Sequence, residues 1–202
     1  MCGRAFLHEP ATQPANSSVV SSEQVAVLAL AAVLVFWMVG AYNRLVALRS
    51  AIGAAWAGIS QTLQQRGDVV APLLLALQQP LAAEHGALDA LRTSHGQAHA
   101  AAAQMTAQPL ALASVSTWRT AEASLASAAS RVLALLDQHA ELRSTRPVAT
   151  GVATWHLAGS RLAYGCQVYD AAVAAYNEAA TQMPTRWLLR LYGFAPAARL
   201  KG

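Results

Sequence analysis

The sequence predicts an all-α protein in which an N-terminal transmembrane helix is continuous with an antiparallel four-helix bundle. The segment from Gln24 to Asn43 contains no charged residue and is long enough to span a membrane. After residue 43, apolar residues recur every three or four positions, and no strand-like alternation of any length occurs. The apolar fraction of 55% and the charged fraction of 12% suit a helical core and argue against disorder.

The uncharged segment has an apolar core of 18 residues, from Val25 to Tyr42. At ~1.5 Å per residue, a helix of this length crosses most of a ~30 Å hydrocarbon layer. Trp37 and Tyr42 lie where aromatic rings prefer the membrane interface. A cleaved signal peptide is the alternative, with Val39 and Ala41 as the small residues before the cut. The preceding segment is long and lacks a basic cluster, which favours the membrane anchor.

The chain is expected to have four parts. Residues 1–23 form a short mobile segment, 24–43 the transmembrane helix, 44–183 the helical bundle and 184–202 a basic amphipathic tail. Basic residues that follow the membrane segment outnumber those before it, so we expect the N-terminus outside and the bundle in the cytoplasm. One arginine precedes the segment, and these three follow it most closely: Arg44, Arg49 and Arg66.

The first two bundle helices are predicted from their apolar stripes and their prolines. The first stripe contains Leu45, Leu48, Ile52, Trp56, Ile59 and Leu63. Gly67, Asp68 and Pro72 are expected to interrupt this helix. The second is expected from about Leu73 to Gln108, with a kink or a delayed start near Leu81 because of Pro80.

The last two bundle helices show steps of three and four throughout. The third runs from Trp118 to Leu142, with His139 on its buried seam, and is expected to end at Arg146-Pro147. The fourth has a seven-residue repeat that is typical of helices packed along a common seam. Its seam contains Val152, Trp155, Gly159, Leu162, Cys166, Tyr169, Val173, Tyr176, Ala180 and Met183.

A Tyr followed by Asn or Asp occurs at three notable places. Tyr42-Asn43 ends the membrane segment, and Tyr176-Asn177 and Tyr169-Asp170 lie one heptad apart on the fourth helix. In an up-and-down bundle the first two pairs are close in space. Buried Tyr and Asn need hydrogen-bond partners and fix the register of helices. We therefore predict a structural clasp of Tyr42, Asn43, Tyr169, Asp170, Tyr176 and Asn177, which pins the first helix to the fourth.

The net charge of +4 arises in the last part of the chain, because the rest holds as many acidic as basic side chains. A nucleic-acid binder would spread its basic residues over a face of the fold, so no nucleic-acid partner is expected. The stretch "TRWLLRLYGF" places aromatic and apolar residues beside arginines. It predicts a membrane-interface tail, a cap on the bundle end, or both. The residues concerned are Arg186, Trp187, Arg190 and Phe194.

Three stretches of the chain resemble the LemA family. They are "YNRLVALRSAIGAAW" (42–56), "ISQTLQQRGDVVAPLL" (59–74) and "YDAAVAAYNEAATQMP" (169–184), the last followed by "LLRLYGF". The resemblance implies a membrane-anchored, all-helical domain in a bacterial envelope, here the inner membrane. It supplies no reaction, because the family has no agreed biochemical activity.

No motif in the sequence indicates catalysis. His95 and His99 share one helix face at the spacing of two metal ligands, but a zinc site needs three or four, and no HExxH occurs. No GxSxG elbow or glycine-rich phosphate loop is present either. We therefore predict no catalytic residue, no cofactor and no metal site, and we expect that the protein is not an enzyme.

The expected function is a non-catalytic scaffold or adaptor at the membrane. Its expected partners are the lipid bilayer and another membrane or envelope protein, with homo-oligomerisation left open. One alternative is a membrane-shaping or lipid-binding module that uses the tail. Another is a hydrolase or metal-dependent enzyme that uses His95 and His99, which requires the imidazoles to converge with a carboxylate in a cleft.

Overall fold

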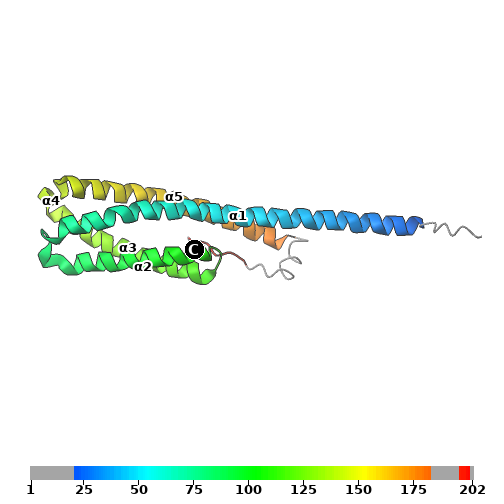
Figure 1. Ribbon diagram of the computed structural model, residues 1–202, viewed down its shortest axis with the longest axis horizontal. Helices are drawn as coiled ribbons and strands as arrows, with labels where there is room; N and C mark the ends of the chain where they lie inside the picture. Colours follow the sequence, from blue (N-terminus) through cyan, green and yellow to red (C-terminus); the bar gives the residue numbers. More distant parts are fainter. Residues whose placement is uncertain (1–20, 183–195, 201–202) are drawn as a thin grey trace, which may run out of the picture. The chain divides into compact units, whose positions relative to one another are not determined.

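A computed structural model describes residues 21–182 and 196–200 of the chain (Figure 1). Within these ranges every regular element is helical, so the all-α class is confirmed. The α-helices are α1 (Ser22–Gln78), α2 (His85–Ala107), α3 (Leu112–Gln138), α4 (Ala140–Ser144) and α5 (Arg146–Thr181), with a short 3₁₀ helix η1 (Ala82–Glu84). The chain divides into two compact units, Met1–Trp37 and Met38–Gly202.

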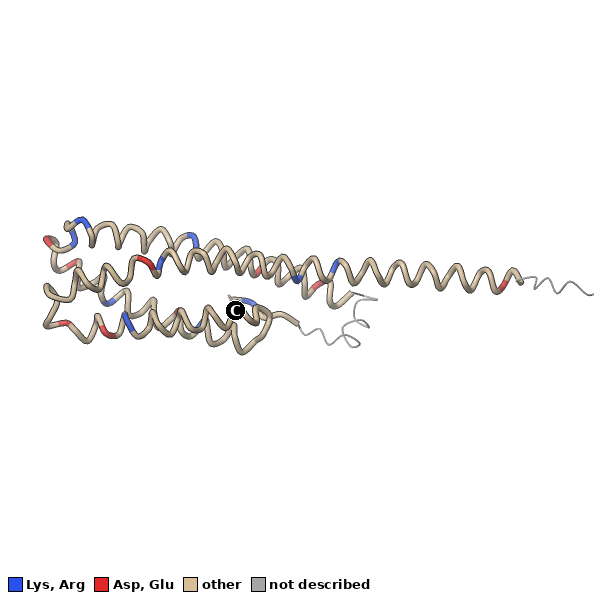
Figure 2. The backbone as a smooth tube through the Cα atoms, viewed as in Figure 1, with Lys and Arg blue, Asp and Glu red and all other residues tan. Residues whose placement is uncertain are grey.

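The described part of the first unit is the beginning of α1. The helix starts with a capping box: the Ser21 backbone N–H donates to Gln24 Oε1 at 3.1 Å, and the Gln24 backbone N–H donates to Ser21 Oγ at 3.3 Å. The apolar side chains that follow are exposed, among them Val27 at 66% and Phe36 at 78%. Figure 2 shows the long uncharged stretch of this helix. In the described part of the chain, α1 is the one helix long and apolar enough to cross a membrane.

In the second unit, α5 lies beside α1 and runs in the opposite direction (Figure 1). Arg44 near the start of this part of α1 donates to Gln182 Oε1 at 3.3 Å, just after the end of α5. Further along, Gln65 Oε1 accepts from Arg161 Nη1 at 3.2 Å. The two helices approach closely at Gly165, where a Cβ would lie 2.9 Å from Ile59 Cγ1. A larger residue at position 165 would therefore force Ile59 to shift at this crossing.

Helix α2 also packs on α1 in the opposite direction, and α3 packs beside α2 (Figure 1). Trp56 of α1 donates from Nε1 to Thr106 Oγ1 of α2 at 3.1 Å. Gly67 of α1 leaves room for His95 of α2. A Cβ at this position would lie only 3.2 Å from His95 Nε2. The buried faces of α1, α2, α3 and α5 all contribute to the core of this unit.

The predicted end of the first bundle helix is wrong, and proline chemistry explains the difference. Gly67, Asp68 and Pro72 do not interrupt α1, which continues to Gln78. Pro72 is exposed, so water can reach the carbonyl that lacks its amide donor. The break occurs at Pro80, and α2 begins only at His85, in agreement with the predicted delayed start.

The predicted connection between the third and fourth helices is also shifted. His139 is not a seam residue, because it ends α3 as its half-exposed C-cap. Arg146-Pro147 does not end a helix but begins α5, where proline suits the first turn since its missing N–H would have no intrahelical partner. The short helix α4 fills the interval.

The heptad seam of α5 is confirmed over most of its length. Gly159 is an exception, because it is exposed and the adjacent Ala158 is buried instead, and Trp155 is only half-buried. Met183 lies outside the described residues. The buried seam positions are Val152, Leu162, Cys166, Tyr169, Val173, Tyr176 and Ala180.

The core of the second unit has two parts. We call the first the aromatic cluster, because its largest members are Trp56, Trp118, Tyr169 and Tyr176; it also contains Leu45 and Ile52, among others. We call the second the aliphatic cluster, because its fully buried members are Val, Leu and Ala residues such as Val70, Leu77, Leu125 and Val132.

Candidate functional site

The Asx residues of α5 hold a segment from the end of the chain. The Asn177 side chain forms two hydrogen bonds with Ala197, donating to its carbonyl and accepting from its N–H, each at 2.9 Å. One heptad earlier, Asp170 Oδ1 accepts from the Leu200 N–H at 2.6 Å. Ala197 and Leu200 are 7% and 4% exposed and belong to the aromatic cluster. These two side chains therefore fix the segment 196–200 against the core.

Tyr169 connects the aromatic cluster to the turn between α2 and α3. Its hydroxyl donates to the Pro109 carbonyl, and its ring meets the Trp56 ring edge-on with centroids 6.4 Å apart. Trp56 makes a second edge contact with Trp118, at 5.5 Å. Burial, and to a lesser degree the Asp170 carboxylate, raises the pKa of Tyr169 to about 12. Tyr169 is thus a neutral hydrogen-bond donor at physiological pH.

The predicted clasp has its six residues in different settings. Tyr169 and Tyr176 are fully buried, and burial raises the pKa of Tyr176 even though Arg49 opposes the shift. Tyr42 and Asn43 are exposed on α1. The neighbouring Arg44 reaches the end of α5 through its bond to Gln182, but no described contact tests a pairing of Asn43 with Asn177. A clasp between α1 and α5 therefore stays a prediction.

His95 and His99 line one cavity of about 310 Å³ between α1 and α2. Its apolar lining includes Leu63, Leu125 of α3 and alanines, and its polar lining includes Ser60, Gln64, Arg66 and Thr106. Thr106 is already bonded to Trp56 and to the Ala102 carbonyl. The two imidazoles thus face a small chamber with mixed apolar and polar walls.

A buried ion pair controls the charge of this cavity. Arg66, 6% exposed, donates from both terminal nitrogens to the carboxylate of Glu122, at 2.5 and 2.7 Å, and its guanidinium lies 5.0 Å from the Trp155 ring centroid. Burial, then the charges of Arg66 and His99, lower the pKa of His95, while Glu122 opposes them. His95 is therefore neutral near pH 7.

This arrangement supplies only part of what a metal or hydrolytic site needs. Glu122 is the nearby carboxylate, but both of its oxygens bond Arg66. In the described part of the chain, no group of three His, Cys, Asp or Glu side chains could hold a metal ion. The Arg66 guanidinium beside the imidazoles would also repel a cation.

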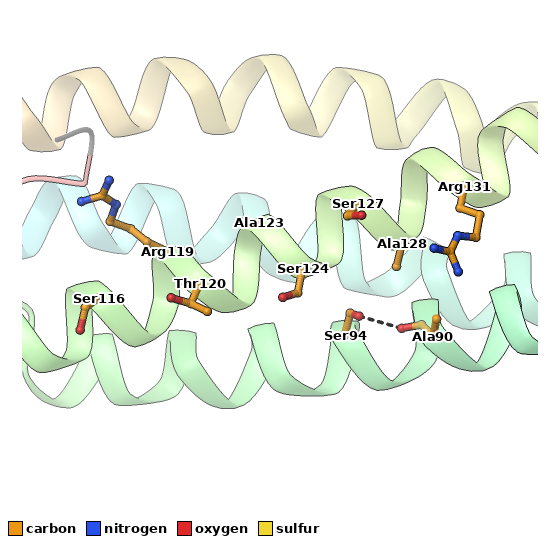
Figure 3. Close-up of a pocket in the computed structure, with 10 residues that line it drawn as sticks. All are labelled: Ala90, Ser94, Ser116, Arg119, Thr120, Ala123, Ser124, Ser127, Ala128 and Arg131. Carbon is orange, nitrogen blue, oxygen red and sulfur yellow. Dashed lines mark hydrogen bonds between the residues drawn. The ribbon is translucent and has the colours of Figure 1, made fainter.

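A groove along α3 was not predicted from the sequence. It holds about 900 Å³ and is walled by α2 and α3 (Figure 3). Arg119 and Arg131 lie at its opposite ends, and Ser, Thr and Ala side chains line the space between them. A pattern in the sequence could have predicted this groove. Small residues recur at steps of three and four on a second face of the third helix, and arginines bound that face.

The four residues of the predicted membrane-interface tail, Arg186, Trp187, Arg190 and Phe194, lie outside the described residues. Of the tail, the structure describes residues 196–200, and there Arg199 is exposed while Ala197 and Leu200 are buried. That short segment packs on the bundle.

The chain was compared with models of known protein families. The model of the LemA family matches residues 55–201, which is most of the chain and includes α5 and the segment that Asp170 and Asn177 hold. No curated protein matches the chain.

Proposed function

Because the chain belongs to the LemA family, we propose that it is a membrane-anchored, non-catalytic scaffold or adaptor of the bacterial envelope. In this proposal residues 24–43 span the inner membrane once. Residues 44–183 form an antiparallel four-helix bundle that presents helical surfaces to another membrane or envelope protein. No reaction is part of the proposal.

The exposed apolar surface at the start of α1 is the observation that carries the proposal. Val27, Phe36 and Trp37 are all more than half exposed, and the most apolar 18-residue window of the helix has no buried residue. A continuous apolar surface of this kind needs a cover, and a lipid bilayer matches its length and its lack of charge. A helix that buried this face in its own fold would show the opposite pattern.

The opposed pairing of α1 with α5 and with α2 supports the antiparallel bundle. The helices are held by side-chain packing over two contiguous clusters, which suits a rigid body that displays its outer faces. A scaffold needs such rigidity, since mobile surfaces lose binding free energy when they become ordered.

The anchor is tested by extracting membranes from cells that express the full chain. We expect the protein to resist alkaline carbonate and to be released by detergent. The double variant Leu30→Arg/Leu34→Arg puts two charges at the centre of the span, which costs about 2.5–3.5 kcal/mol per residue, and should move the protein to the soluble fraction. Arg92→Glu is the control, because it changes charge on an exposed face of α2. Complete extraction of the unaltered chain by carbonate would refute the anchor.

Orientation is tested by thiol labelling in intact cells. Cys2 precedes the span, and Cys166 is buried in α5 and is protected in the folded chain. A membrane-impermeant maleimide should label Cys2 without permeabilisation. In the variant Cys2→Ser/Ser130→Cys, whose new thiol lies on the exposed side of α3, labelling should require permeabilisation. The reverse pattern would place the bundle outside the cytoplasm.

The adaptor role is tested by crosslinking and gentle purification. The full chain, solubilised in several detergents, should retain the same envelope protein in each. A shared partner that is absent from a control purification supports the role. Recovery of no common partner would count against it, and would leave the anchor and the fold untouched.

A further inference from the structure

The groove along α3 is a surface feature to which the proposed function gives no role. It holds about 900 Å³, and its chemistry is distinct from that of the histidine cavity. Its lining contains two arginines and no acidic side chain. Figure 3 shows Thr120 and Ser124 directed toward α2, with the Arg119 side chain near one end on the opposite side of α3 and Arg131 at the other end.

The groove is hollowed because the side chains on its floor are small. The Ser94 hydroxyl at the base donates to the Ala90 carbonyl at 2.7 Å, so it needs no further partner. Small side chains on a helix face allow a second helix to approach closely, and helices pack at axial distances of 8–10 Å according to the side chains at their contact. The residues between the arginines are Thr120, Ala123, Ser124, Ser127 and Ala128 of α3.

The two arginines are free to accept a partner's charges. Both are exposed, and neither has an ion pair or hydrogen bond with any residue in the described ranges, whereas Arg66, Arg92 and Arg143 each pair with a carboxylate. Arg119 and Arg131 are twelve residues apart, or ~18 Å along α3. In a partner helix, positions i and i+11 are ~16.5 Å apart along the axis, which matches the ~18 Å between the arginines; Arg119 and Arg131 project ~120° apart around α3, one on each flank of the groove.

We propose that this groove binds an α-helix of the partner protein, which carries small residues on its contact face and acidic residues about eleven positions apart. This inference rests on the adaptor role and assigns it a surface. A second copy of the chain is a poorer occupant. Two such grooves packed face to face would bring arginines together, and like charges across an interface oppose binding.

The test uses the full chain in detergent and two synthetic helical peptides of 18 residues. Both have an Ala/Ser contact face; one carries Glu at i and i+11, and the other carries Lys there. Fluorescence anisotropy should show binding of the Glu peptide only. Arg119→Glu/Arg131→Glu should weaken that binding at least tenfold and should create binding of the Lys peptide. Arg161→Glu makes the same change at an exposed arginine of α5 outside the groove and should leave the affinity within about twofold.

Filling the groove provides a second test. Ala123→Trp places a large ring between the arginines and should abolish peptide binding. The control is Ala126→Trp, three residues further along α3, which is exposed and lies outside the groove and should leave peptide binding unchanged. Both variants should keep the far-ultraviolet circular dichroism of the unaltered chain, which shows that the bundle is folded.

Three results would overturn the proposal. One is equal binding of the Glu and Lys peptides. Another is a stable dimer that Ala123→Trp dissociates, which would make a second copy the occupant. The third is loss of binding to anionic vesicles in Arg119→Glu/Arg131→Glu with no effect on the peptides, which would make the groove a lipid surface. Charge-selective peptide binding with no common envelope partner would refute the adaptor role and leave the groove assignment intact.

Discussion

The aromatic and aliphatic clusters hold the same helices by different means. The aliphatic cluster contributes Val, Leu and Ala side chains, whose burial is favourable but not directional. The aromatic cluster adds polar groups at defined places: Tyr169 bonds the Pro109 carbonyl, and Trp56 bonds Thr106. Asp170 and Asn177, on the flank of the same seam, bond the segment 196–200.

The difference shows where the fold needs specificity. Apolar packing tolerates exchange of similar side chains, so the aliphatic cluster stabilises the helices without selecting one partner segment. A buried donor or acceptor favours the packing arrangement that pairs it, because leaving the group unpaired costs about 1–3 kcal/mol. The aromatic cluster therefore determines which turn and which terminal segment meet the helices.

The largest effects should come from large-to-small substitutions in the two clusters. Trp56→Ala should lower the free energy of unfolding by about 4 kcal/mol and Leu77→Ala by about 3 kcal/mol, because each leaves a cavity. Only Trp56→Ala should also speed hydrogen exchange around residue 109, since it removes neighbours of Tyr169 and Thr106. Urea unfolding and hydrogen exchange measure both quantities. If amide hydrogen exchange around residue 109 became equally fast in the two variants, the proposed difference between the clusters would be wrong.

Glu122→Gln should have the next largest effect. The Arg66–Glu122 pair lies between the clusters, with side-chain exposures of 7% and 18%, and the substitution leaves Arg66 as an uncompensated charge. We expect a loss of about 3 kcal/mol in urea unfolding. The double variant Arg66→Met/Glu122→Leu should recover most of that loss, because it removes both charges together. Asp89→Asn, at the exposed pair with Arg92, is the control and should change stability by less than about 0.5 kcal/mol.

Asn177→Ala should have a smaller and more local effect. It removes both hydrogen bonds to Ala197, so we expect a loss of about 1–2 kcal/mol and faster exchange of the Ala197 and Leu200 amides. Glu178→Ala, on the exposed side of the same helix turn, should leave both amides protected. Unchanged protection in Asn177→Ala would show that the Asp170 bond and the burial of Leu200 retain the segment without Asn177.

The parts of the fold that depend on periodicity could be predicted from the sequence. The seam of α5 follows from burial on one face, and burial of Cys166, Tyr169 and Val173 agrees with it. The helix break was placed too early, because the sequence shows that Pro72 lacks an amide proton but not that its face is exposed. Tertiary exposure decides whether a proline ends a helix or is tolerated in it.

The hydrogen-bond partners of the Tyr-Asx pairs could not be predicted from the pattern. The sequence indicated that Asp170 and Asn177 flank a buried seam and need partners. The described partners, Ala197 and Leu200, bond through their backbones, which every residue carries, so no side chain marks them in advance. The α3 groove was missed for a related reason, because small residues show no strong pattern until α2 places a second wall beside them.

The smallest effect should be a pH dependence that arises at His95, between the two clusters. Its pKa is lowered in the folded chain from 6.5, first by burial and then by the charges of Arg66 and His99, against Glu122. Below pH 6.5 the unfolded chain therefore binds more protons at this residue than the folded chain. Stability from this group is complete above pH 6.5 and is lost as the pH falls toward the folded pKa.

Urea unfolding between pH 8 and 5 should show this decline, and His95→Gln should reduce it. His156→Gln, which changes an exposed imidazole on α5, should retain it. If the free energy of unfolding falls as steeply with pH in His95→Gln as in the unaltered chain, the pH dependence arises at other groups and not at His95.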